Sequence, residues 1–82
     1  MTPVLFFAQL REDLGCDKID IDLQAPCSVT ELRDRIVADN PQWQAIFKHS
    51  LLLCSVNQTL SDFEDQVSPG DEVAFFPPVT GG

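Results

Sequence analysis

The residues best suited to chemistry are the two glycines at the end of the printed sequence, Gly81 and Gly82. Residues without a Cβ are thin and turn freely, so a segment that ends in them can be threaded into a narrow active site on another protein. The group presented there would be the main-chain carboxylate of Gly82. The ending therefore predicts that the reacting group is this carboxylate and not a side chain.

The residues that carry this carboxylate are expected to form an extended tail. Pro77 and Pro78 stiffen its base and direct it away from a sheet, because a proline ring fixes φ and cannot continue a central strand. Extended at about 3.3–3.6 Å per residue, residues 77–82 reach about 20 Å, which is enough to enter a neighbour's pocket. We therefore predict a folded domain at residues 1–76 and a tail at residues 77–82. The tail comprises Pro77, Pro78, Val79, Thr80, Gly81 and Gly82.

Activation of the carboxylate must come from another protein. The sequence has no Gly-rich phosphate loop followed by Lys and Ser or Thr, and no nucleophile and base arranged around its one histidine, His49. The cysteines Cys16, Cys27 and Cys54 are odd in number and widely spaced, unlike a disulfide framework or a metal site. We expect free thiols, with Cys54 as a packing residue, and no bound metal. Sulfur carriage by one of the thiols stays open.

The composition predicts one small soluble domain. The chain has 82 residues, of which 44% are hydrophobic and 22% are charged, as in ordinary globular proteins. Thirteen acidic residues against five basic ones give a net charge of −8, which disfavours binding to nucleic acid or to an anionic membrane and favours basic protein partners. No apolar run approaches the roughly 20 residues of a membrane span, and the start lacks the features of a signal peptide. A cytoplasmic location is expected.

The first half of the chain predicts a hairpin and then a main helix. Residues 4–10 form an apolar run and residues 19–23 alternate strictly, with Gly15 marking a turn between two strands. Ser28 and Glu31 fit a capping box, in which each side chain satisfies a free backbone N–H at a helix start. The helix that follows has an apolar stripe that should pack on the sheet. The stripe consists of Val29, Leu32, Ile36 and Val37.

The second half predicts a short helix, a strand, a short irregular piece and a last strand. Asn40, as the cap, and Pro41 signal the helix start. Residues 51–56 are typical of a strand buried on both faces, and Pro69-Gly70 fits the centre of a type II turn before the strand at residues 72–76. This element order predicts an α+β, ubiquitin-like β-grasp fold. Such a fold has a mixed β-sheet packed on one main helix, here with a flexible C-terminal Gly-Gly tail.

Strand alternation predicts a docking surface around the exit of the tail. Phe76 falls on the face of the last strand that carries Glu72, so it is expected to be exposed. In the first strand, Phe7 shares a face with the polar Gln9. We therefore expect Phe7, Leu60 and Phe76 to form an apolar partner-binding patch. For Phe7, burial in the core is an almost equally good interpretation.

Three segments of the chain resemble the small subunit of molybdopterin synthase. They are VLFFAQLRE at residues 4–12, VNQTL at residues 56–60 and GDEVAFFPPVTGG at residues 70–82. The resemblance spans the whole chain, although residues 16–50 match in element order only. It implies the β-grasp arrangement, in which the first and last strands are parallel neighbours at the sheet centre, as a right-handed crossover allows.

The resemblance also implies a sulfur carrier of molybdenum cofactor biosynthesis. In that family a ubiquitin-activating-type adenylyltransferase uses ATP to adenylate the C-terminal glycine, here Gly82, and a sulfur-donating enzyme converts it to a thiocarboxylate. The large subunit of molybdopterin synthase then transfers the sulfur to cyclic pyranopterin monophosphate, in a heterotetramer of two small and two large subunits. The chain would bind no cofactor and catalyse nothing alone. Family members dock through an apolar patch, the role expected of Phe7, Leu60 and Phe76.

Three alternatives stay open: a sulfur carrier for thiamin synthesis or tRNA thiolation, a ubiquitin-like modifier joined to lysines through Gly82, and a passive interaction module. The segment FFPPVT at residues 75–80, which leads to the glycines, favours the molybdopterin pathway. The fold alone does not separate these functions, because one scaffold hosts many of them.

Overall fold

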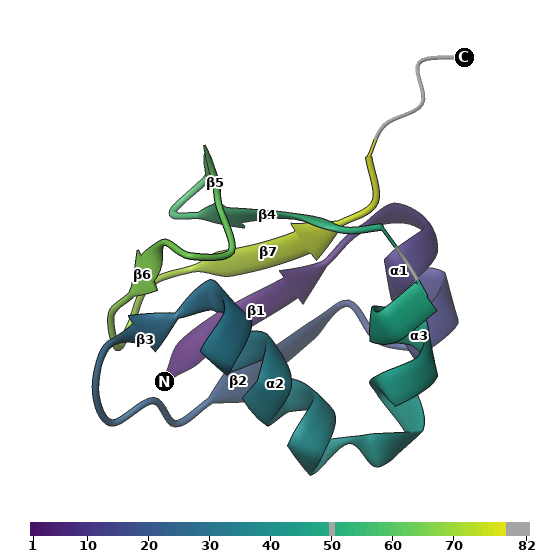
Figure 1. Ribbon diagram of the computed structural model, residues 1–82, viewed down its shortest axis with the longest axis horizontal. Helices are drawn as coiled ribbons and strands as arrows, with labels where there is room; N and C mark the ends of the chain where they lie inside the picture. The colour runs from purple at the N-terminus through teal and green to yellow at the C-terminus, as the bar shows by residue number, and fades with distance from the viewer. Residues whose placement is uncertain (50, 79–82) are drawn as a thin grey trace.

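The computed structural model of the chain describes residues 1–49 and 51–78, and Figure 1 shows the arrangement of their helices and strands. In chain order the elements are β1 (Thr2–Phe6), α1 (Ala8–Leu14), β2 (Lys18–Ile21), β3 (Cys27–Ser28), α2 (Val29–Asp39), the 3₁₀ helix η1 (Pro41–Trp43), α3 (Gln44–His49), β4 (Leu53–Val56), β5 (Thr59–Ser61), β6 (Gln66–Val67) and β7 (Val73–Phe76).

The main sheet has the strand order β2-β1-β7-β4-β5. β1 and β7 are parallel, whereas β1 with β2, β7 with β4, and β4 with β5 are antiparallel. The parallel pair of first and last strands confirms the expected β-grasp arrangement, with α2 in the connection between them. β3 and β6 form a separate two-stranded sheet.

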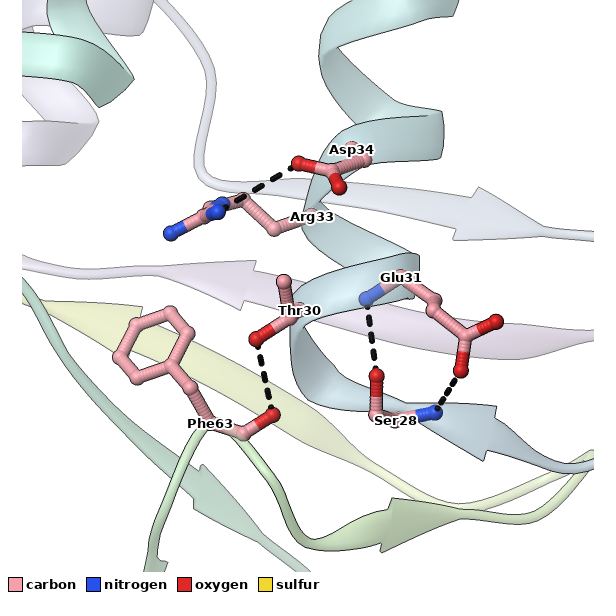
Figure 2. A network of polar contacts seen from close by, with 6 residues as sticks. All are labelled: Ser28, Thr30, Glu31, Arg33, Asp34 and Phe63. Carbon is pink, nitrogen blue, oxygen red and sulfur yellow. Dashed lines mark hydrogen bonds and ion pairs between the residues drawn. The ribbon is translucent and has the colours of Figure 1, made fainter.

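The main helix, α2, begins where the capping box predicts. The Ser28 hydroxyl accepts a hydrogen bond from the Glu31 N–H at 3.1 Å, and the Glu31 carboxylate accepts one from the Ser28 N–H at 3.0 Å (Figure 2). Both bonds satisfy backbone donors that a helix start leaves free. The stripe residues Val29, Leu32 and Ile36 are buried, so the helix packs on the sheet as expected.

The connection between β1 and β2 is a helix, and the prediction of a simple hairpin turn there was wrong. The strand ends at Phe6, and the chain turns through Ala8, whose φ of 56° lies in the left-handed region. Leu10 and Leu14 are one helical turn apart in α1, and both are buried. Gly15 ends this helix with a φ of 76°, a C-terminal position that favours glycine.

The strand predicted at residues 51–56 is shorter and less buried than expected. β4 starts at Leu53, which is 38% exposed, and Leu51 is 76% exposed, so only one face of the strand enters the core. Asn57 and Gln58 both have positive φ and connect β4 to β5 in a two-residue hairpin. The expected irregular piece therefore contains β5 and β6.

Of the two local signals in the second half of the chain, the turn at Pro69-Gly70 was predicted correctly and the helix cap at Asn40 was not. Gly70 has a φ of 92°, and the Asp71 N–H donates to the Ser68 carbonyl at 3.0 Å, as the predicted type II turn requires. Asn40 precedes the short helices as expected, but its side chain does not cap them. Instead its amide donates to the Ile36 carbonyl at the end of α2.

A cluster of buried side chains joins the helices to one face of the sheet. At its centre the Phe6 ring meets Trp43 edge-on at 5.7 Å, and Phe47 meets Phe75 edge-on at 6.0 Å between centroids. Each such aromatic pair adds about 0.5–1.5 kcal/mol to the free energy gained by burial. In the part of the chain that the structure describes, no helix has the length and apolar character needed to cross a membrane.

Candidate functional site

The tail begins at the end of β7, where β1 runs into α1 (Figure 1). Phe76 is the last residue of the strand, and Pro77 and Pro78 follow it without regular structure and half-buried. The other predicted tail residues, Val79, Thr80, Gly81 and Gly82, lie outside the described residues. The division between domain and tail at residue 76 stays a prediction.

The pairing register divides the residues around the tail exit between two faces of the sheet. Val4 pairs with Val73 and Phe6 with Phe75, and all four are fully buried on the face that α2 covers. Because side chains alternate along a strand, the residues next to these four in β1 and β7 point to the opposite, outer face. These outer-face residues include Leu5, Ala74 and Phe76.

Phe7 lies on the outer face beside Phe76. Its backbone is extended, and its N–H donates to the Phe75 carbonyl at 3.2 Å, which continues the pairing of β1 with β7 by one residue. Phe7 therefore shares the face of Leu5, and it is 45% exposed. The structure places Phe7 at the surface. Gln9 does not share this face, because it lies in α1, so that part of the strand prediction was wrong.

Phe76 is half-buried, although alternation predicted an exposed ring. Two neighbours explain the difference: Phe7 lies on one side, and Leu53 pairs directly with Phe76 on the other. Leu60, which is 68% exposed, pairs with Ser55, and Ser55 pairs in turn with Ala74. Leu60 thus lies on the same outer face but at its edge, with β4 between it and β7.

Leu53 is the outer-face residue that the sequence did not reveal. The run of leucines before Cys54 hides the alternation, since apolar residues occupy both faces of β4. The register could have been found only from the pairing of β4 with β7. We call Phe7, Leu53, Leu60 and Phe76 the outer-face patch.

Two of the three thiols, those of Cys27 and Cys54, are poorly suited to carry sulfur. Cys54 is fully buried, and its Sγ donates to the Ser61 carbonyl at 3.3 Å, which confirms its packing role. Burial raises the pKa of the Cys54 thiol, and the nearby Asp65 and Asp62 raise it further. Burial also raises the pKa of Cys27. A raised pKa keeps a thiol protonated and therefore weakly nucleophilic.

The described residues, 1–49 and 51–78, contain no group of three His, Cys, Asp or Glu side chains that could hold a metal ion. Cys16, Cys27 and Cys54 are free thiols. The candidate functional site is the tail exit, where the outer-face patch borders the start of residues 77–82.

Known proteins resemble the chain over its whole length. Residues 4–82 match the ThiS family. The chain is 46% identical to the molybdopterin synthase sulfur carrier subunit of Escherichia coli K12 over 82 residues, 100% of both chains. Identity to the Haemophilus influenzae subunit of the same name is 42%, again over 100% of both chains. The fold matches SAMP1 from Haloferax volcanii with a TM-score of 0.79 at 25% identity, over 99% of this chain and 98% of that one.

Proposed function

Because the chain belongs to the ThiS family and, within it, to the molybdopterin synthase sulfur carrier subunits, we propose that it carries sulfur on the terminal carboxylate of Gly82. The observation that supports this most is the full-length similarity to the E. coli subunit, which extends to residue 82. The tail exit beside the outer-face patch gives the carboxylate a route into a partner's active site.

The chemistry requires two activations in sequence. A carboxylate is a poor electrophile, so an adenylating partner first joins Gly82 to AMP from ATP and releases pyrophosphate. Sulfur from a sulfur-donating enzyme then displaces AMP and leaves a thiocarboxylate. Sulfur is a better nucleophile than carboxylate oxygen, so the thiocarboxylate can attack cyclic pyranopterin monophosphate in the large synthase subunit. Two such transfers supply the two sulfurs of molybdopterin.

The chain contributes the reacting group and the docking surface, and its partners contribute catalysis. A synthase small subunit implies a large-subunit partner. The outer-face patch suits that contact, because exposed aromatic and aliphatic side chains are typical anchors of protein interfaces. With the patch docked, residues 77–82 reach at most about 20 Å into the partner.

Intact mass spectrometry tests the proposal. The chain is incubated with the adenylating enzyme, ATP and a sulfur source, and fragmentation locates any added mass. We expect one oxygen of Gly82 to be replaced by sulfur. The matched control is the chain without Gly82, which should unfold at the same temperature, because the buried cluster extends only from Val4 to Phe75, and should take up no sulfur. Molybdopterin formation by the control would contradict the proposal.

The fold similarity to SAMP1, a small archaeal modifier protein, favours one second candidate, a ubiquitin-like modifier. In that case the activated Gly82 would form an isopeptide bond with a lysine of another protein. Digestion of cell proteins and a search for lysines that carry the terminal remnant of this chain would separate the two functions. Loading of Gly82 with sulfur that the pterin system cannot discharge would instead favour a carrier for thiamin synthesis or tRNA thiolation.

A further inference from the structure

A groove of about 500 Å³ lies between α2 and α3, away from the outer-face patch. Its lining comes from both helices: Arg33, Asp34 and Val37 from α2, and Gln44, Phe47 and Lys48 from α3. Both helices pack on the inner face of the sheet, through Ile36 and Phe47 among others. The groove therefore stays open when a partner covers the outer face.

The groove has a charged rim and a small apolar area at its base. Phe47 is buried and Val37 half-buried, so they form this apolar area, while Lys48 and Gln44 are exposed at the rim. The chain has five Lys and Arg residues against thirteen Asp and Glu. Two of the five, Arg33 and Lys48, face this one groove, each from a different helix, so the charge of the groove is locally opposite to the net charge of −8 that favours basic partners for the chain as a whole.

Neighbouring contacts hold Arg33 in place. Its guanidinium lies 5.4 Å from the centre of the Phe63 ring and donates to the Asp34 carboxylate at 3.4 Å (Figure 2). The Phe63 carbonyl in turn accepts a hydrogen bond from the Thr30 hydroxyl at 3.0 Å, which attaches the Phe63 loop to α2. A positioned guanidinium loses less side-chain entropy when it binds an anion.

Lys48 is the second cation of the groove. Among residues 1–49 and 51–78, its ammonium is in no ion pair, whereas Arg33 pairs with Asp34. The Asp34 carboxylate also lines the groove, and it would repel a doubly charged anion such as phosphate bound there, because like charges repel. A singly charged carboxylate placed between Arg33 and Lys48 fits the net charge of the rim better.

We propose that this groove binds an acidic peptide segment of a partner protein, with a carboxylate between Arg33 and Lys48 and an adjacent apolar side chain against Val37. The two cations of the rim support this occupant, and the half-buried Val37 offers a small apolar contact beside them. The proposal does not depend on sulfur transfer, because the groove and the outer-face patch lie on opposite sides of the sheet.

The test is an NMR titration of the ¹⁵N-labelled full chain with the blocked peptide acetyl-Ala-Leu-Glu-amide, which carries one carboxylate, beside the neutral acetyl-Ala-Leu-Gln-amide. We expect the acidic peptide to shift amide signals of residues 33–37 and 44–48 and to bind more tightly than the neutral one. Lys48→Gln should weaken binding about two- to fivefold, as expected for one exposed ion pair. Lys18→Gln is the control and should change nothing, because Lys18 pairs with Leu5 and so lies on the outer face of the sheet, opposite the helices that line the groove.

Three results would overturn the proposal: no binding of the acidic peptide, equal binding of the neutral peptide, or equal weakening by Lys48→Gln and Lys18→Gln. Lys48 is exposed, so its replacement should leave the fold intact, which the unshifted signals of the β-sheet would verify.

Discussion

Leu53 provides the sharpest test at the scale of a residue, because it lies directly opposite Phe76 and is 38% exposed. Replacement by serine removes apolar surface from the outer-face patch without opening a cavity in the core. We expect Leu53→Ser to weaken binding to the large synthase subunit about tenfold, the effect of losing one interface anchor. Titration calorimetry with the large subunit measures this.

The control for Leu53→Ser is Gln58→Ser, an exposed position in the turn between β4 and β5 that is not part of the patch. It should leave the affinity unchanged. Thermal unfolding of both variants must match that of the parent chain, so that a change in affinity can be assigned to the surface. Equal affinities for Leu53→Ser and the parent would remove Leu53 from the interface.

The buried thiol of Cys54 and the half-buried thiol of Cys27 predict a fall in stability at alkaline pH. Burial raises the pKa of Cys54 and of Cys27 above the ordinary value of 9.0. The unfolded chain therefore loses these protons at lower pH than the folded chain does. The contribution to stability is complete below the unfolded pKa and is lost as the pH rises through the folded pKa.

The absence of tyrosine from the sequence leaves few other groups that titrate in this window. Denaturant unfolding from about pH 7 to about pH 10 measures the effect. We expect the free energy of unfolding to fall above about pH 9, and to fall less steeply in a Cys27→Ala, Cys54→Ala double variant. An identical slope in the double variant would assign the alkaline loss to other groups.

At the scale of an element, the capping box of α2 is directly testable. Ser28→Ala removes the acceptor of the Glu31 N–H and should cost about 1 kcal/mol. For a domain of this size, that lowers the melting temperature by about 4–8 °C. Ser28→Asp keeps an acceptor at the same place and should unfold close to the parent temperature. Equal losses in both variants would show that the hydroxyl does not stabilise the helix start.

The elements that sequence predicts well are those with local chemical signals. Ser28 and Glu31 mark the start of α2, because their side chains bond to the free backbone N–H groups there. Gly70 marks the turn before β7, because glycine readily adopts the positive φ that the turn needs. The helix α1 has no such start signal, since Phe7 provides no side-chain cap, and its apolar residues continue those of β1. An unbroken apolar run therefore conceals the change from strand to helix.

The candidate site was predicted only in part, because some of its residues have a local sequence signal and others do not. Alternation in β7 correctly places Phe76 on the outer face, and the structure adds that Phe7 is exposed beside it. Leu53 could not be found from its own strand, because apolar residues occupy both faces of β4. Its place depends on the register with β7, which is a property of the folded sheet.

At the scale of the whole molecule, the two faces of the sheet give the protein two distinct sides. The helices cover the inner face and leave the outer face to the patch, and the tail starts at the end of the central strand β7 (Figure 1). The central parallel pair was expected only from the family resemblance, since no local pattern specifies which distant strands become neighbours. The arrangement of the strands and the function were therefore predicted from the family resemblance. The individual helices, strands and turns were predicted from the chemistry of their own residues.

A single-turnover experiment tests the central claim most directly. The chain carrying a thiocarboxylate at Gly82 is mixed with the large synthase subunit and cyclic pyranopterin monophosphate, and the intact mass of the chain is followed over time. We predict that sulfur leaves Gly82 as molybdopterin forms, with two chains discharged for each molybdopterin produced. Molybdopterin formation while the thiocarboxylate persists, or no discharge despite stable binding to the large subunit, would contradict the account.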